Sequence, residues 1–213
     1  MPHQYLTELV TPSVAAAQQD YGSRAQVARL VAAWDTGTRL GPEEAEFVAE
    51  RDTFFLASVG ESGWPYVQHR GGPVGFLRVL DDGATLAWAD FRGNRQYLSV
   101  GNVAASGRVS LLLLDQLHAR RLKVIGTATV HDVRTGDPTG LLEQVALPGY
   151  VARVERVITV QVQGFDWNCP QHIAPRWTQG ELAPLHDELA RLQAENAALR
   201  AQVAGLPDDR PPV

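Results

Sequence analysis

The stretch 84-ATLAWADFRGNRQYLSVGN-102 joins an apolar strand to a turn that carries two arginines and then to an amphipathic run. Arg92 and Arg95 lie around Gly93 and Asn94, where the chain leaves the strand. Backbone N–H groups at such a turn, and at the N-terminus of a helix that follows it, favour an anion. A solvated turn is the simpler explanation of one isolated R-G-N-R, so an anion site needs support from the rest of the chain.

Short β-rich runs on both sides of this stretch indicate an antiparallel fold. They are rich in β-branched and aromatic residues and are separated by turn signals such as GESG and DDG. The first four runs are predicted to form an antiparallel meander, and 94–106 a crossover helix. The predicted strands are 53–59, 64–70, 76–80, 84–89, 108–115, 119–133 and 154–167. Six or seven strands with few helical interruptions predict a mainly β, closed or split barrel rather than a doubly wound sheet.

Helical patterns precede the predicted strands. Thr11 and Pro12 provide the N-cap and first-turn proline of a helix that ends near Gly22, and 23–34 and 42–51 are predicted to be further helices. The predicted organisation is an N-terminal helical cap (1–52), a split barrel (53–180), a C-terminal amphipathic helix (181–206) and a tail (207–213).

Composition limits the kinds of function that fit. The chain has 213 residues, 45% hydrophobic residues, a net charge of -5 and one cysteine, Cys169. No apolar run approaches the length of a membrane span, and residues 1–20 lack the pattern of a secretory signal, so we expect a cytoplasmic protein without a membrane partner. The negative net charge argues against a broad nucleic-acid interface and favours a small anionic ligand for the clustered arginines.

A second motif, 68-QHRGGPVGF-76, ends a predicted strand at Arg70 and then places Gly71, Gly72 and Gly75 where side chains could have packed. Glycines allow a flat ligand or another backbone to come close. A glycine-rich hairpin bend explains the same residues equally well.

Two further segments carry candidate polar residues. In 120-RRLK-123 strand alternation puts Arg121 and Lys123 on one face, although basic residues on a barrel strand are also typical of a solvated face. The irregular segment 167-WNCPQHIAPRW-177 follows the last long strand. The histidines lack short ligand spacing and cysteine partners, so no metal site is expected.

The order of W-P-x-V-Q-H-R-G-G-P-x-G-F, W-A-D-F-R-G-N-R-Q, R-R-L-K-V-I-G-T-A and W-N-C-P-Q-H-I-x-P-R resembles the FMN-binding split-barrel proteins related to pyridoxamine 5′-phosphate oxidase. The resemblance covers roughly residues 10–180. It implies an FMN at the interface of a homodimer, with its phosphate held by basic side chains and its far wall supplied by the partner chain.

The resemblance also implies roles for individual residues. Arg70 and Arg95 would bind the phosphate, for which a permanently charged, bidentate guanidinium is suited. Trp88 and Ala89 match positions whose backbone lines the flavin, and Asn94 matches a polar ligand of the same loop. The remaining candidates near the cofactor are Gly71 and Gly72.

Arg121 takes the place of a family glutamine that reaches the flavin ring, where a positive charge would stabilise the anionic reduced form. Trp167 and Arg176 match a tryptophan and an arginine that would reach the partner's flavin. The oxidase binds its vitamin substrate through an Arg-x-His pair and a lysine, but this chain has Gln171–Ile173 and Gly75 in those regions. Oxidation of pyridoxamine phosphate is therefore not expected.

The expected function is an FMN-dependent oxidoreductase that transfers a hydride to or from a small organic substrate, with no catalytic acid or base identified. One alternative is a protein that stores or senses flavin, haem or another planar cofactor without turnover. Another is a structural or regulatory module built on the barrel.

The segment 182-LAPLHDELARLQAENAALRAQVAGL-206 spaces apolar residues at alternating steps of three and four. This heptad pattern predicts a helix from near Pro184 to about Ala204. Asn196 at an a position, with Glu195 and Arg200 at g and e, favours a parallel two-stranded coiled coil. An amphipathic helix that lies on its own barrel is the alternative.

Overall fold

The computed structural model describes residues 3–33, 37–136 and 140–205. These residues form two compact units. The larger holds the described residues of Met1–Asp115 and Ala119–Ile173, and the smaller holds Gln116–His118 and the described residues of Ala174–Val213. The larger unit contains the sheet and is called the barrel unit below.

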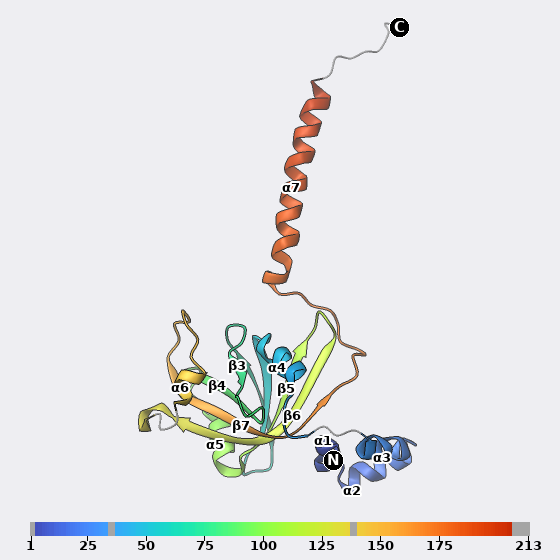
Figure 1. Cartoon of the computed structure of the whole chain (residues 1–213), viewed down its shortest axis with the longest axis vertical. Helices are drawn as coiled ribbons and strands as arrows, with labels where there is room; N and C mark the ends of the chain where they lie inside the picture. The colour runs from blue at the N-terminus through green and yellow to red at the C-terminus, as the bar shows by residue number, and fades with distance from the viewer. Residues whose placement is uncertain (1–2, 34–36, 137–139, 206–213) are drawn as a thin grey trace. The chain divides into compact units, whose positions relative to one another are not determined.

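Seven antiparallel strands form one sheet, in the order β2-β1-β5-β6-β7-β4-β3 (Figure 1). This confirms the predicted mainly β split barrel with peripheral helices. The strands are β1 (Thr53–Val59), β2 (Pro65–Gly71), β3 (Leu77–Val79), β4 (Thr85–Phe91), β5 (Arg108–Asp115), β6 (Arg120–Asp132) and β7 (Val154–Trp167).

The first four strands do not form the predicted meander. β1 pairs with β2 and β3 pairs with β4, but β2 and β3 lie at opposite edges of the sheet. The glycine-rich connection explains the difference. Gly72 N donates to Asp52 O at 3.0 Å and Gly75 N donates to Arg51 O at 3.1 Å, so the chain runs back along the start of β1 instead of turning into a hairpin.

The core fills the inside of the curved sheet. Phe54 stacks on Phe76 with ring centroids 5.6 Å apart and meets Trp88 edge-on at 5.1 Å. Strand β5 buries every second residue, as expected for a strand with one face on a core. In the long pair β6–β7 the register shifts after Ile125, and at this bulge a Cβ on Gly126 would lie only 2.4 Å from Gln161 O, so the position requires glycine.

Six helices and one 3₁₀ turn accompany the strands in the barrel unit. They are α1 (Gln4–Leu9), α2 (Pro12–Asp20), α3 (Arg24–Ala33), α4 (Pro42–Ala49), α5 (Leu98–Ser106), α6 (Leu141–Gln144) and η1 (Val133–Thr135). The Thr11 hydroxyl caps α2 as predicted, and α5 is the predicted crossover helix, although it begins four residues later. Helix α1 is not evident from the sequence, because its N-cap is His3, an unusual capping residue.

The smaller unit contains α7 (Gln179–Ala204), which begins five residues before Pro184. A capping box sets this start: Glu181 Oε2 accepts from Thr178 N at 2.6 Å, and Glu181 N donates to Thr178 Oγ1 at 3.2 Å. Pro184 therefore lies inside the helix, where it removes one backbone hydrogen bond. Leu206 and the predicted tail 207–213 lie outside the described residues. None of the described helices combines the length and the apolar composition that crossing a membrane requires.

Candidate anion-binding site

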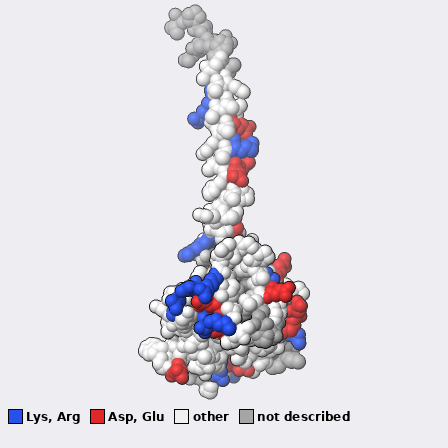
Figure 2. Space-filling view, turned by 90° about the vertical axis from the view of Figure 1, so that its left-hand side faces the viewer, with Lys and Arg blue, Asp and Glu red and all other residues white. Residues whose placement is uncertain are grey.

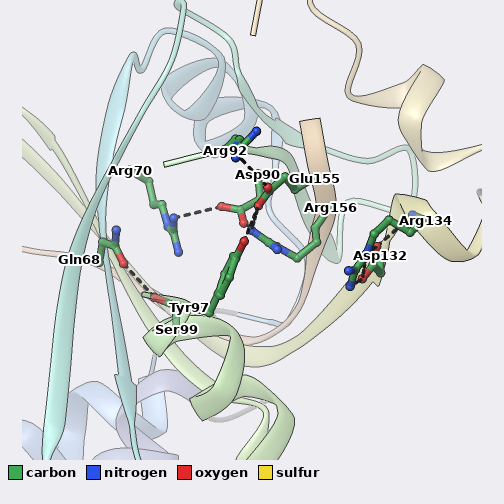
Figure 3. Close-up of polar contacts among 10 residues, drawn as sticks. All are labelled: Gln68, Arg70, Asp90, Arg92, Tyr97, Ser99, Asp132, Arg134, Glu155 and Arg156. Atoms are coloured by element: carbon green, nitrogen blue, oxygen red, sulfur yellow. Dashed lines mark hydrogen bonds and ion pairs between the residues drawn. The ribbon is translucent and has the colours of Figure 1, made fainter. Parts of the chain in front are cut away.

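A buried ion-pair network joins the two halves of the sheet where the barrel is split. Arg70 on β2 and Arg156 on β7 both point at Asp90 on β4 (Figure 3). Arg70 Nη1 lies 3.0 Å from Asp90 Oδ1, and Arg156 Nε lies 2.9 Å from Asp90 Oδ2. The Asp90 side chain is 4% exposed, so two guanidinium groups offset the cost of burying it. The network holds Arg70 at a fixed place beside the start of α5.

The turn between β4 and α5 has an unusual backbone. Arg95 and Tyr97 adopt the left-handed region, with φ of 62° and 56°, which residues other than glycine rarely do. Tyr97 is the N-cap of α5 and makes no side-chain capping bond. The first N–H groups of α5 therefore have no side-chain cap, and the positive end of the helix dipole lies at the same place. Left-handed residues of this kind gather at ligand sites.

A small cavity of about 40 Å³, called the α5 cavity below, lies at this helix N-terminus. Its polar lining consists of Gln68, Arg70, Asn94, Arg95, Ser99 and Arg156. Ser99 donates to Gln68 Oε1 at 3.3 Å, which ties the first turn of α5 to β2 (Figure 3). The cavity thus combines three guanidinium groups with a helix N-terminus, which is the chemistry of an anion site.

One N–H donor of Arg70 is not used within the described residues. Its Nε is buried and has no hydrogen-bond partner among the described residues. A buried donor without a partner is rare in folded proteins and needs an explanation, such as a missing ion. Arg70 also lines the α5 cavity, so its guanidinium is a candidate ligand for an anion bound there.

A larger cleft of about 630 Å³, called the arginine cleft below, adjoins the α5 cavity and shares Arg95, Tyr97, Val100 and Arg156 with it. Its charged lining consists of Arg92, Arg95, Arg134, Arg153, Arg156, Asp132 and Glu155. Figure 2 shows a face of the barrel unit where basic side chains gather around a few carboxylates. In a chain of net charge -5, the cleft and the cavity together hold six arginines against three carboxylates, counting Asp90.

Hydrogen bonds keep these groups charged. The Arg134 side chain and backbone N–H hold the pKa of Asp132 at about 2. A hydrogen bond with Tyr97 raises the pKa of Arg95. Burial opposes the charged form of Arg156, but hydrogen bonds and attraction to Asp90 and Glu155 raise its pKa overall. Asp132, Arg95 and Arg156 are therefore charged at neutral pH.

The other residues predicted from the first motifs lie around this site with different roles. Asn94 lines the α5 cavity and accepts from Gln96 N at 3.1 Å, which shapes the turn. The Trp88 side chain is 1% exposed and belongs to the core, and Ala89 is buried beside it on β4. A Cβ on Gly72 would lie 2.7 Å from Phe76 Cγ, so packing within the chain already explains that glycine. Gly71 is similarly close to His69, at 3.1 Å.

The structure does not bring Arg121 and Trp167 to the α5 cavity. Arg121 lies 11 positions before Asp132 on β6, roughly 35 Å of strand. Its Nη2 donates to Cys169 O at 2.6 Å and holds the irregular segment after β7. Trp167 donates its indole N–H to Glu44 Oε1 at 2.7 Å and meets Phe47 edge-on. Arg176 belongs to the smaller unit.

The sequence motifs do not identify several residues of the site, among them Asp90, Arg156 and Arg153. Asp90 interrupts an otherwise apolar strand, and a carboxylate at such a position signals a buried cationic partner. Its partner could not be identified, because Arg156 is 66 residues away and meets Asp90 only through the β4–β7 pairing. The lining of the arginine cleft comes partly from η1 and partly from the start of β7, and no sequence motif links these two segments.

Comparisons with known proteins find one family model and several solved structures that are similar to this chain. Residues 40–140 match the family model described as pyridoxamine 5′-phosphate oxidase. No curated protein matches the chain. Among solved structures, a putative pyridoxamine 5′-phosphate oxidase from Lactobacillus delbrueckii is 20% identical, with 61% of this chain and 94% of that chain covered and a TM-score of 0.45.

Two other solved structures are similar at the same level. An F420 reductase is 22% identical, with 59% of this chain and 98% of that chain covered and a TM-score of 0.41. HupZ of Group A Streptococcus is 14% identical, with 65% of this chain and 99% of that chain covered and a TM-score of 0.46.

Proposed function

We propose that this chain binds FMN and is an oxidoreductase for a small organic substrate, because its residues 40–140 match the family model described as pyridoxamine 5′-phosphate oxidase. The observation that carries the proposal is the α5 cavity, where Arg70, Arg95 and Arg156 surround a helix N-terminus without a side-chain cap. These groups suit a phosphate, which distinguishes FMN from riboflavin.

The residues present fit a flavin phosphate. Arg70 and Arg95 are its proposed ligands, and the buried Nε of Arg70 supplies a donor that no described residue uses. The buried carboxylate of Asp90 orients Arg70 through its contact with Nη1, while the Arg70 side chain also lines the cavity. Asn94 and Ser99 add polar groups at the cavity wall.

When bound, the flavin supplies the capacity to accept or donate a hydride. The chain's own residues contribute binding and electrostatics: the arginines hold the phosphate and Asp90 fixes their geometry. This chain lacks the lysine and the Arg-x-His pair through which the oxidase holds its vitamin substrate. We therefore propose a substrate other than pyridoxamine phosphate.

We further propose a homodimer with shared flavin sites. Arg121 lies far along β6 from the α5 cavity of its own chain, so a role at a flavin ring requires a second chain. The same holds for the role proposed for Trp167, and the family resemblance implies that Arg176 also reaches the partner's flavin. An apolar surface supports pairing: Phe55, Val67 and Leu112 line a hollow of about 390 Å³ on the outer face of β1, β2 and β5. Phe55 and Val67 are 36% and 60% exposed, which is unusual for large apolar groups on neighbouring strands.

The visible absorption spectrum of the purified full-length protein tests cofactor binding. We expect flavin bands, and FMN as the compound that heat releases. A colourless protein that does not take up added FMN would contradict the proposal and favour a structural module. A haem spectrum would favour the binding-protein alternative.

Turnover needs a separate experiment. The bound flavin is reduced anaerobically with NAD(P)H and then mixed with candidate acceptors. An oxidoreductase should reoxidise its flavin faster than free FMN reacts with the same acceptor. Equal rates for every acceptor would favour a protein that stores or senses flavin.

A further inference from the structure

The arginine cleft has more positive charge than its carboxylates balance. Arg134 is paired with Asp132, and Arg156 is held by Asp90 and Glu155. Arg153 makes no ion pair within the part of the chain that the structure describes, and Arg92 reaches Glu155 only at 3.9 Å. A cleft that keeps arginines with incomplete partners attracts an anion from solution.

The rest of the cleft lining is apolar. Val100, Val130, Val133 and Val154 line it together with the ring of Tyr97. At about 630 Å³ the cleft is of the size that holds a small organic molecule rather than a single ion. Valines around a group of arginines match a ligand with an apolar body and a charged end.

The cleft is separate enough from the α5 cavity to hold its own ligand. Arg92, Arg134 and Arg153 line the cleft and not the cavity, whereas Arg70 and Asn94 line the cavity and not the cleft. The two share Arg95 and Arg156, so an anion in one place lies next to the anion in the other. A phosphate bound in the α5 cavity therefore leaves Arg92 and Arg153 available.

From this arrangement we infer that the arginine cleft binds an organic anion, a carboxylate or phosphate ester with an apolar body, in addition to the phosphate in the α5 cavity. Arg153 and Arg92, which lie side by side through the hydrogen bond from Arg92 N to Arg153 O at 2.9 Å, bind the charged end, and the valines contact the body. A role of this anion as the substrate of the oxidoreductase rests on the proposed function. Binding of the anion in the cleft is independent of the proposed function, because the lining residues are present whether or not flavin is bound.

Calorimetric titration of the full-length protein with saturating FMN tests the inference, using 1-naphthyl phosphate, 1-naphthol and inorganic phosphate as probes. Naphthyl phosphate should bind at least about tenfold more tightly than either of the other two, because only it uses both the arginines and the valines. Loss of one charge-assisted hydrogen bond lowers affinity by about tenfold or more, and we expect this for Arg153→Gln and for Arg92→Gln. Both side chains are exposed, so neither change should affect folding.

Two controls separate the cleft from the cavity. Arg29→Gln, on the exposed face of α3, should leave all affinities unchanged. Arg70→Gln should weaken FMN and leave naphthyl phosphate unaffected. If Arg70→Gln weakened naphthyl phosphate binding while Arg153→Gln and Arg92→Gln did not, the inference would be wrong. If the protein bound no FMN but still bound naphthyl phosphate through Arg153, the proposed function would fail and the cleft assignment would stand.

Discussion

Asp90 is the residue on which the geometry of the site depends. It is buried between Arg70 and Arg156, and it links strands from the two ends of the sheet order. Its own role is in positioning, because its oxygens are used by the two arginines. The sequence identifies Arg70 and Arg95 through the family resemblance, but it does not reveal the carboxylate that holds Arg70, since that contact arises only when β2, β4 and β7 come together.

At the residue scale, Asp90→Asn should lower the free energy of unfolding by roughly 3 kcal/mol, because two buried guanidinium groups lose their counter-charge. Chemical denaturation measures this change. Asp132→Asn is the matched control: its partner Arg134 is 84% exposed, and solvent screens such a pair, so no measurable change in stability is expected. Equal effects of the two substitutions would show that the Asp90 network does not stabilise the barrel.

At the element scale, strand positions could be predicted well and strand partners poorly. Alternation and turn residues mark each strand within about two residues, because they are local signals. The partners of β2 and β3 depend on hydrogen bonds from Gly72 and Gly75 to the start of β1, which no local pattern encodes. The start of α7 was likewise predicted from one local signal, Pro184. The helix instead begins at Gln179, because Thr178 and Glu181 form a capping box there.

Within its own unit, α7 has no buried residue. Leu185, Leu189, Leu192, Leu199 and Val203 are 47–67% exposed. Three glutamates occupy successive g positions, Glu181, Glu188 and Glu195, and an antiparallel pair would bring such positions together with like charges. These features agree with a parallel coiled coil between two copies. Arg191 bonds to Glu188 and Glu195 within one helix at 2.7 and 3.1 Å, so interchain pairing of Glu195 with Arg200 must compete with it.

Removal of residues 179–213 should therefore weaken dimerisation and leave the flavin spectrum unchanged, as sedimentation and absorbance can show. Asn196→Leu should raise the thermal midpoint and loosen the oligomeric state, because a buried asparagine fixes register at a cost in stability. Ala197→Leu, at a b position outside the seam, is the control and should change neither the thermal midpoint nor the oligomeric state. An unchanged dimer constant after truncation would favour a helix that lies on its own barrel.

In the proposed homodimer, each complete flavin site requires residues from two chains. Arg70 would come from one chain, and Arg176 from the other. An Arg70→Ala chain and an Arg176→Ala chain should each bind FMN weakly, yet their heterodimer should regain one intact site. Equilibrium titration of mixed, differently tagged chains measures the recovered fraction. Heterodimers without recovered binding would place both arginines around the flavin of one chain.

The family match over residues 40–140 confirms the resemblance inferred from four short motifs, and the sheet confirms the fold. The proposed phosphate site, which Arg70 and Arg95 form at the N-terminus of α5, goes beyond this family match. Titration of the full-length protein with FMN and with riboflavin tests whether that site binds a phosphate. FMN should bind more tightly, and Arg70→Ala should lower FMN affinity by about ten- to a hundredfold, for one lost charge-assisted contact of roughly 1.5–3 kcal/mol, without changing riboflavin affinity. Equal affinity for the two flavins would contradict the account.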